Sequence, residues 1–538
     1  MLQWPRVGPV DGSGGDDGEV EAIDVELPDN RRGMLAPVCL GIGLAVSVIL
    51  ALLSDGPYHD DALTHFLYAR WAWNNPAYLL DAWGRPGLTV LLFPAAALGW
   101  TACRLVSSLA AAASVWMALD IARQLRFSRA SWVPLLCYVQ PLFLMAAYTT
   151  LTETASALYL TAAIWCLVRG RAAWSAVALS LCFVTRYELL VLLPIWGMAL
   201  WRLRAGWQCF ALLLWAPLAH NLLGAILLDR WPLAYLLTGS SGTDMYGQGG
   251  PLTMCIKSMA ASGPPVAILA LVGLGLRRAS RGWWLIPACY GGHLLTQSMI
   301  YWLGAFASGG YPRFMVTTSP LAALCAVAAL EAAAGKPVHL RRRIWLAVAF
   351  VTALLTVGLE IELRTADETW LFLIDKVRPL VRVLAAIVLL AIAWQWVRPG
   401  RWPKVILATV ALVATALPLS YLIRPHRPPE YARSIGAAVR WLDGTEHADA
   451  PVVATNIWAS HHLDRGYNVV PPDALDILDD LPAGTVFIWD AVYSPTPRFE
   501  LSVEAMRHRP QWRLIWSDTA ADSQPVWSRI YLRLPPGR

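Results

Sequence analysis

The sequence predicts an all-α multi-spanning membrane protein with about thirteen transmembrane helices, followed by a C-terminal α/β domain. Of its 538 residues, 57% are hydrophobic and only 15% are charged, whereas a soluble protein carries about 25% charged residues. Apolar stretches recur at lengths that suit bilayer crossings of roughly 20 residues. From Pro425 onward the pattern changes to short β-rich runs such as "PVVATNIW" and "GTVFIWD", which are typical of a globular module.

Basic residues stand in short clusters between the apolar stretches, so the formal charge of +6 indicates membrane topology and not nucleic-acid binding. The N-terminal residues 1–33 are acidic and Gly-rich, and we expect them to form a disordered cytoplasmic tail. Arg31 and Arg32 precede the first span, 34–54, which places the following loop outside. Only four of the 43 basic residues are lysines, a bias that with abundant Ala and Trp is typical of a bacterium with a G+C-rich genome.

The membrane domain is predicted over residues 34–424, with a first outer loop at 55–102. Within that loop, the short apolar stretch 87–100 contains Pro94 and Gly99, and we expect it to lie in the interface. The remaining spans then place every later basic cluster inside and the domain 425–538 outside. The spans after the first loop are expected at about 103–122 and 131–149, then at a span that ends at 169–171 and at two short stretches flanking 185–188. Later spans are expected at about 207–227, 264–276, 284–304, 315–334, 344–362, 380–397 and 404–423.

Ionisable residues on the predicted outer side are the candidates for chemistry, because carboxylates at a membrane boundary are costly unless solvated or paired. Asp60 and Asp61 begin an amphipathic stretch, "DDALTHFLYARWAW". The pair could cap this helix, but adjacent carboxylates also suit a general base. Glu153, in "YTTLTET", is either a third acidic site residue or a solvated anchor.

Arginines at outer positions run against the positive-inside trend, and the planar guanidinium suits phosphate. Arg85, Arg186 and Arg313 are therefore candidate phosphate ligands, with local pairing, such as Arg186 with Glu188, as the alternative for each. The histidines show no spacing typical of zinc, so a divalent metal at the aspartate pair is an open alternative and no cofactor is assigned. The nine cysteines lie in or beside apolar segments and are expected to be buried thiols.

Several of these motifs, in this order, resemble those of the GT-C glycosyltransferases, most closely the branch of dolichyl-phosphate-mannose protein mannosyltransferases and undecaprenyl-phosphate aminoarabinose transferases. The motifs are "HDDALTHFLYARWAW", "DAWGRPGL", "LTET", "TRYE" and "YPRF". The resemblance implies a catalytic Asp in the first outer loop, matched by Asp60. The family usually has Asp-Glu there, so Asp61 is a departure. It also implies an acidic residue at Glu153 and basic residues at Arg85 and Arg186.

The function that the resemblance implies is transfer of a sugar from a polyprenyl-phosphate donor to a glycan, lipid or protein acceptor at the outer face of the cell membrane. Asp60 would be the base, Asp61 and Glu153 would orient the acceptor or tune Asp60, and the three arginines would hold the phosphate. Three alternatives are a flippase or transporter of a lipid-linked glycan, an oligosaccharide polymerase or ligase, and a structural membrane protein with an outer adhesion domain. The sequence does not specify the sugar or the acceptor.

Overall fold

The computed structural model describes residues 30–229, 248–276, 278, 280, 282–305, 309–334, 338–365, 371–397, 401–464, 478, 480–496, 499–518 and 526–535. The predicted disordered tail lies almost entirely outside these residues, as do most of the outer loop expected after residue 227 and most of "DALDILDDL". The chain forms two compact units. Unit 1 comprises residues 1–49, 85–91 and 104–424, and unit 2 comprises 50–84, 92–103 and 425–538. The loop 55–102, predicted to lie outside, and the C-terminal module thus belong mostly to one unit.

Apolar helices make up most of unit 1. Over the described residues, seven helical segments are long and apolar enough to cross a membrane, or eight if one bent pair counts as a single span. They are Met34–Leu53, Trp100–Gln124, Trp207–Leu228, Pro312–Ala334, His339–Ile361, Pro379–Val397 and Trp402–Leu422, and the bent pair is Ala130–Tyr138 with Pro141–Ala147. Four shorter apolar helices occur at Pro86–Ala96, Thr152–Val168, Ala172–Thr185 and Pro264–Leu274. The chain is therefore a mostly helical, multi-pass membrane protein.

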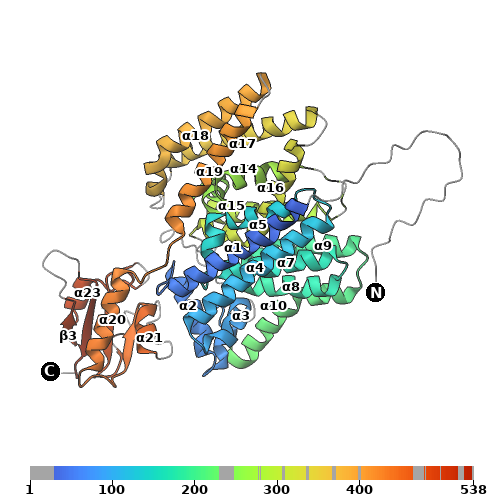
Figure 1. The fold of residues 1–538 in the computed structure, drawn as a ribbon. Helices are drawn as coiled ribbons and strands as arrows, with labels where there is room; N and C mark the ends of the chain where they lie inside the picture. The colour runs from blue at the N-terminus through green and yellow to red at the C-terminus, as the bar shows by residue number, and fades with distance from the viewer. Residues whose placement is uncertain are drawn as a thin grey trace, which may run out of the picture. The chain divides into compact units, whose positions relative to one another are not determined.

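The helices are labelled as in Figure 1. Their bounds from α1 to α9 are α1 Asn30–Leu53, α2 Asp60–Trp71, α3 Pro86–Ala96, α4 Trp100–Gln124, α5 Val133–Tyr138, α6 Pro141–Ala147, α7 Thr152–Val168, α8 Ala172–Thr185 and α9 Leu193–Arg202. The later ones are α10 Trp207–Leu228, α13 Thr253–Ser262, α14 Pro264–Leu274, α15 Leu285–Trp302, α16 Ser319–Ala334, α17 Val338–Thr365, α18 Leu371–Val397 and α19 Arg401–Leu422. Two 3₁₀ turns matter below: η3 Tyr187–Leu192 and η5 Pro312–Thr318.

The span expected at 131–149 is broken in the structure. Helices α5 and α6 meet at a 76° bend, where Pro141 cannot continue the helical hydrogen bonding. The Gln140 side chain satisfies the carbonyls left over at the break, because its Nε2 donates to Leu136 O and Ser319 O, each at 2.9 Å.

The stretch 87–100, which was expected to lie in the interface, does not form one long helix. Helix α3 has 11 residues, which reach only about 16 Å and fall short of a bilayer crossing.

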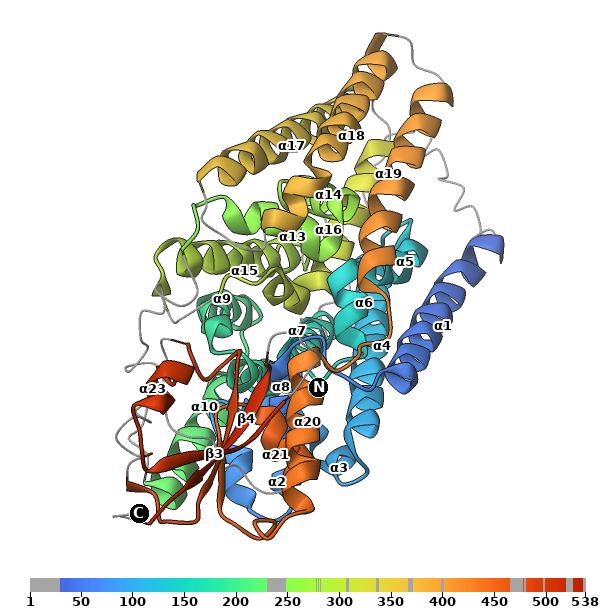
Figure 2. The ribbon, with the colours of Figure 1, turned by 90° about the vertical axis from the view of Figure 1, so that its left-hand side faces the viewer.

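The helices of unit 1 differ sharply in how much of their surface other helices cover. The segment Pro312–Ala334, which includes α16, is 83% buried, whereas the spans of α18 and α19 are 11% and 6% buried. Figures 1 and 2 show α17, α18 and α19 side by side, with α14 and α16 next to them. Apolar surface left uncovered on α18 and α19 suits contact with lipid, and α16 forms part of the interior of the unit.

The C-terminal part of unit 2 contains a small mixed sheet. Within the described residues it has four strands in the order β1-β2-β4-β3: β1 Val452–Ala454, β2 Val486–Asp490, β4 Ser528–Arg533 and β3 Trp512–Ser517. Strands β1 and β2 are parallel, and the other pairs are antiparallel. Helix α20, Glu430–Asp443, buries Ala432, Ile435, Val439 and Leu442 at helical spacing, as an amphipathic helix packed on a sheet should. Helices α21, Ile457–Leu463, and α23, Val503–Arg507, complete the module.

Candidate active site

The structure distributes the predicted site residues over both units. Asp60 and Asp61 lie on α2 in unit 2, and Glu153, Arg85, Arg186 and Arg313 lie in unit 1. The unit 1 residues come from the start of α7, the residue before α3, the end of α8 and η5. These four are brought close together, as their shared contacts show below.

Helix α2 begins at Asp60, and its N-cap is His59, whose Nδ1 accepts a hydrogen bond from the Asp61 backbone N–H at 3.3 Å. The aspartates therefore do not occupy the capping position, although both lie in the first turn, where the helix dipole favours negative charge. The His59 Nδ1 also lies 3.3 Å from Asp61 Oδ2, and the Asp61 side chain is 29% exposed.

Asp60 itself is buried, and its carboxylate is engaged by the C-terminal module. The hydroxyls of Tyr431 and Tyr493 donate to Oδ2 at 2.8 and 2.9 Å. The indole Nε1–H of Trp458 donates to Oδ1 at 3.1 Å. Each oxygen of this carboxylate thus accepts at least one hydrogen bond from a neutral donor.

Glu153 is at the centre of a charged cluster in unit 1. The carboxylate is only 1% exposed, and its Oε1 accepts a hydrogen bond from Arg186 Nη1 at 2.9 Å. Thr152 adds a contact to each partner: its hydroxyl donates to Glu153 Oε2 and accepts from Arg186 Nη1. Because a buried carboxylate needs compensation, Glu153 is an ion-pair partner here and not a solvated anchor.

Arg186 also pairs with Glu188 on η3, as the alternative from the sequence anticipated. Its Nε and Nη2 both lie 2.6 Å from Glu188 Oε1. Gln297 on α15 donates to the same oxygen at 3.2 Å. Arg186 therefore bridges two carboxylates, Glu153 and Glu188, and is held in one orientation by both.

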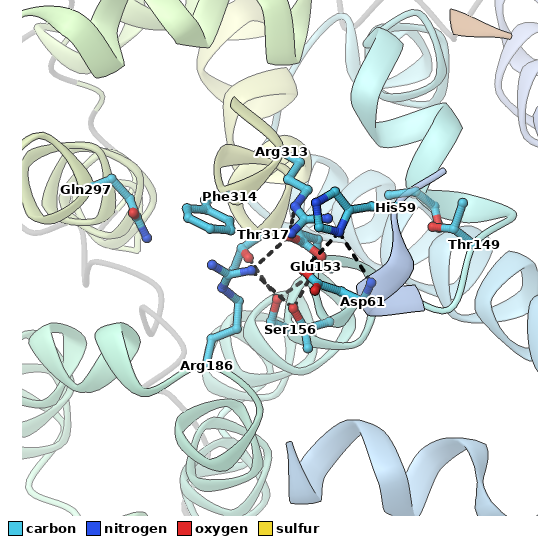
Figure 3. A network of polar contacts seen from close by, with 12 residues as sticks. His59, Asp61, Thr149, Glu153, Ser156, Arg186, Gln297, Arg313, Phe314 and Thr317 are labelled. Atoms are coloured by element: carbon cyan, nitrogen blue, oxygen red, sulfur yellow. Dashed lines mark hydrogen bonds and ion pairs between the residues drawn. The ribbon is translucent and has the colours of Figure 1, made fainter. Parts of the chain in front are cut away.

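Arg313 approaches Glu153 from η5, with its Nε 3.5 Å from Glu153 Oε1. Figure 3 shows the side chains of Arg186 and Arg313 pointing toward Glu153 from different elements. The ring of Phe314 lies beside both arginines, with the guanidinium carbons 4.3 and 5.8 Å from its centroid. A hydrogen bond of 2.8 Å between Ser156 and Thr317 fixes η5 to α7.

Arg85 adjoins this cluster through Tyr187, the first residue of η3. Its guanidinium carbon lies 4.9 Å from the centroid of the Tyr187 ring. Its backbone has φ of 59°, in the left-handed region that non-glycine residues rarely adopt. Two residues further along the chain, Gly87 is closely packed, because a Cβ atom there would lie 2.1 Å from the Thr185 hydroxyl oxygen. The Arg85–Pro86–Gly87 step is thus fixed against the end of α8.

The electrostatics of the cluster favour an anion. Burial raises the pKa of the Glu188 carboxyl, but the charges of Arg186 and Arg85 outweigh it and the pKa falls to about 2. Glu188 is therefore ionised at neutral pH. Counted formally, the three arginines and the two carboxylates of Glu153 and Glu188 leave one net positive charge. Such a site can accept a phosphate without a separate counterion.

No group of three or more His, Cys, Asp or Glu side chains that could hold a metal ion occurs among the residues that the structure describes. The nine cysteines are all free thiols, buried or half-buried. The structure thus offers no ready-made metal cage in its described part, and the aspartate pair has one nearby imidazole, that of His59.

Sequence reasoning missed the partners that surround the predicted residues. Gln297, Phe314 and Thr152 had no assigned role, and neither did the three donors to Asp60. Thr152 and Phe314 adjoin predicted residues and could have been found by examining neighbours. Tyr431, Trp458 and Tyr493 lie 371, 398 and 433 residues from Asp60, so no local pattern indicates them.

The chain has the fold of solved ArnT structures, which confirms at the level of the fold the resemblance predicted from the sequence. The chain is similar to ArnT from Cupriavidus metallidurans. The ArnT structure bound to undecaprenyl phosphate has a TM-score of 0.57 and 13% identity, covering 93% of this chain and 98% of that one. The apo ArnT structure gives 0.58 and 13%, covering 94% and 98%. No protein-family model and no curated protein matches the sequence.

Proposed function

We propose that this protein is a glycosyltransferase that moves a sugar from a polyprenyl-phosphate donor to a glycan, lipid or protein acceptor at the outer face of the cell membrane. The observation that carries the proposal is the net-positive arginine cluster around Glu153, in a chain with the fold of ArnT, which has been solved with undecaprenyl phosphate. A lipid-phosphate donor explains why phosphate ligands would be built into a membrane domain.

The reaction makes two demands on the protein. The acceptor oxygen forms a bond to the anomeric carbon of the sugar while its proton passes to a carboxylate, supplied here by the Asp60–Asp61 pair. The bond between the anomeric carbon and the phosphate oxygen breaks, and its electron pair leaves with the polyprenyl phosphate. That phosphate gains a second negative charge, which Arg85, Arg186 and Arg313 would stabilise.

Glu153 has a different role in this proposal from that of a proton acceptor. Because it contacts both Arg186 and Arg313, it orients the guanidiniums and limits the positive charge they present. An over-charged site would hold the product phosphate too tightly, whereas a site of about one net charge can release it.

The proposed topology has about thirteen crossings, a cytoplasmic N-terminus and the 425–538 module outside. It can be tested with single cysteines in a cysteine-free background. Cysteines at 123–129, 201–204 and 339–343 should resist a membrane-impermeant thiol reagent in intact cells, and exposed positions in 440–518 should react. Reaction at 123–129 from outside would contradict an interfacial 87–100 stretch.

The decisive experiment is an assay of the purified full-length protein in detergent with radiolabelled polyprenyl-phosphate sugars and mixed envelope acceptors. Label should move to an acceptor, and Arg85→Ala should lower kcat or raise the donor KM by more than about tenfold. Arg85→Lys should recover part of this because it keeps the charge. Arg513→Ala, at an exposed arginine of β3, is the matched control and should leave the kinetics unchanged.

Two outcomes would reject the transferase. If the donor is never consumed but crosses the bilayer of reconstituted vesicles, the protein is a lipid-linked glycan transporter. If only diphosphate-linked oligosaccharides react, it is a polymerase or ligase. Unchanged kinetics in Arg85→Ala would remove that residue from the phosphate site and leave Arg186 and Arg313.

A further inference from the structure

The carboxylate of Asp60 accepts hydrogen bonds from three separate segments of the C-terminal module, all within unit 2. Tyr431 lies in the first turn of α20, Trp458 in α21, and Tyr493 shortly after β2. The two hydroxyls donate to Oδ2 at 2.8 and 2.9 Å, and the indole Nε1–H donates to Oδ1 at 3.1 Å. Donors from the module thus surround the carboxylate that the family resemblance implies to be the base.

Both phenols are donors to Asp60 and are not bases themselves. Burial raises the pKa of the Tyr431 and Tyr493 hydroxyls, and the charge of Asp60 raises each pKa further. Both hydroxyls therefore keep their protons at neutral pH. The indole N–H of Trp458 can only donate. Three neutral groups thus each supply a permanent hydrogen to the carboxylate.

The three hydrogen bonds are shared unequally between the two carboxylate oxygens. A carboxylate has about four lone-pair positions, two on each oxygen. Among the residues that the structure describes, both tyrosines donate to Oδ2 of Asp60, and Trp458 is the one side chain that donates to Oδ1. One acceptor position therefore remains, and it is on Oδ1. An acceptor hydroxyl can form a hydrogen bond there without displacing a donor of the module.

Proton transfer to Oδ1 leaves every donor of the module with an acceptor. The new O–H group at Oδ1 still has a lone pair for the Trp458 N–H, and Oδ2 still accepts from both phenols. A proton on Oδ2 would instead need a lone pair that Tyr431 or Tyr493 already occupies. Because a buried donor that loses its acceptor is costly, the arrangement directs the proton to Oδ1 of Asp60.

A second buried aspartate, Asp490 at the end of β2, holds two of these donors in place. Its Oδ1 accepts from the backbone N–H of Tyr493 at 2.7 Å. The side chain of Asn456 donates to the same oxygen and caps α21 by accepting from the Trp458 backbone N–H at 3.1 Å. The backbone that carries Tyr493 and Trp458 is therefore fixed by contacts other than those with Asp60, as a preorganised site requires.

We propose that Tyr431, Trp458 and Tyr493 are positioning residues for the base, so that the C-terminal module completes the active site of the first loop. They hold the Asp60 carboxylate with one lone pair of Oδ1 open to the acceptor hydroxyl. The acceptor oxygen bonds to the anomeric carbon as its proton passes to Oδ1. The bond from that carbon to the phosphate oxygen breaks, and its electron pair leaves with the phosphate. This deepens the proposed function and rests on it for the transfer and for Asp60 as the base.

The test begins with kcat and KM of the purified full-length protein, with the radiolabelled donor and the acceptor that the assay above finds active. Tyr431→Phe combined with Tyr493→Phe removes two donors and leaves the carboxylate. It should lower kcat at least about tenfold and change the donor KM less than about threefold, because the arginines proposed for the phosphate lie in unit 1. Tyr531→Phe, which removes a phenol of β4 whose hydroxyl contacts Arg529, is the matched control and should change neither constant.

The same substitutions in an Asp60→Asn background separate positioning from a structural role. Asp60→Asn alone should lower kcat by at least about 10², because an amide cannot take the acceptor proton. Residues that act through one group are not additive, so the two Tyr→Phe changes should then cost less than about threefold more. Trp458→Phe, which keeps an aromatic ring, should show the same loss of additivity. If the double substitution unfolds the protein, each single Tyr→Phe variant enters the same cycle.

Any of three results in an active parent enzyme would overturn the proposal. A loss in kcat of less than about tenfold for the two Tyr→Phe changes means that the phenols do not position the base. A further loss of more than about threefold in the Asp60→Asn background means that they only stabilise the fold. A loss of less than about 10² for Asp60→Asn removes the base on which they would act. A parent that transfers no sugar from any donor rejects the proposed function itself, and this proposal with it.

Discussion

Two buried carboxylates, Glu153 in unit 1 and Asp60 in unit 2, are stabilised in opposite ways. Glu153 is held by full positive charges, those of Arg186 at 2.9 Å and Arg313 at 3.5 Å. Asp60 is held by neutral donors, two phenols and one indole. Both arrangements offset the free-energy cost of burying a charge, but they leave different donors and charges available to a ligand.

The difference indicates what each site can do. A guanidinium that pairs with a carboxylate keeps spare donors and its charge, so it can also bind a phosphate. Phenol and indole donors satisfy Asp60 but contribute no charge for a ligand. The charged cluster therefore suits a site that binds and releases an anion, whereas the donors around Asp60 hold a single carboxylate in place. The predictions below test this contrast, beginning with the largest effect.

Removing the central cation should damage unit 1 most. Arg186→Ala leaves both Glu153 and Glu188 without their closest guanidinium, and breaking a buried pair in this way costs about 3–5 kcal/mol. Arg186→Lys keeps the charge but not the fork, and it should lose clearly less. Thermal unfolding in detergent, followed by fluorescence of the tryptophans, measures both. A melting temperature for Arg186→Ala equal to that of the parent would contradict the role of Arg186 as the bridge.

In unit 2 the corresponding change is at Asp490, the last residue of β2, whose carboxylate accepts from the Thr455 hydroxyl and from the backbone N–H groups of Val492 and Tyr493. Asp490→Ala removes this acceptor without removing a cation. Each donor left unsatisfied costs about 1–3 kcal/mol. The loss should be local, with faster hydrogen exchange at β2 and at 452–464 and little change in unit 1. Asp490→Asn, which still accepts with one oxygen, is the milder control. Equal exchange changes in both units would show that the two regions do not respond separately.

Acid should affect the charged cluster through Glu188. Its pKa in the folded state is about 2, below the ordinary value of about 4.3. The stability it contributes is therefore complete above pH of about 4.3 and declines as the pH falls toward 2, by at most about 1.4 kcal/mol per pH unit. Glu188→Gln should flatten the fall in melting temperature over this range. A slope identical to that of the parent would show that Glu188 does not gain stability from its arginines.

The smallest effect is expected at an exposed ion pair of unit 2, that of Arg70 with Asp464. Arg70 and Asp464 form a 2.7 Å pair, but their side chains are 38% and 61% exposed. Such pairs contribute less than about 1 kcal/mol and are screened by salt. Arg70→Ala should leave hydrogen exchange of α2 within about threefold of the parent at 0.5 M salt. An increase of about tenfold or more would show that this pair contributes more than an exposed ion pair should.

Particular residues show how far the sequence could predict the candidate site. Glu153, Arg186 and Arg313 were predicted separately from their expected positions on the outer side, and the structure brings them together. The pairing of Arg186 with Glu188 could also be predicted from the sequence, because only Tyr187 separates the two residues in "TRYE". The break at Pro141 was not predicted, since an apolar run of 19 residues resembles an unbroken span even when a proline interrupts its hydrogen bonding.

What the sequence by itself determined is the membrane character of the chain, the location of its apolar helices and the change to an α/β module after residue 424. These are local properties, because hydrophobicity over some twenty residues decides whether a segment prefers lipid. Only the tertiary structure decided that Tyr431, Trp458 and Tyr493 meet Asp60 across 371 to 433 residues of chain. A contact of that separation depends on how every intervening helix packs, so the sequence could not show that the Asp60 carboxylate is buried and hydrogen-bonded in the folded chain.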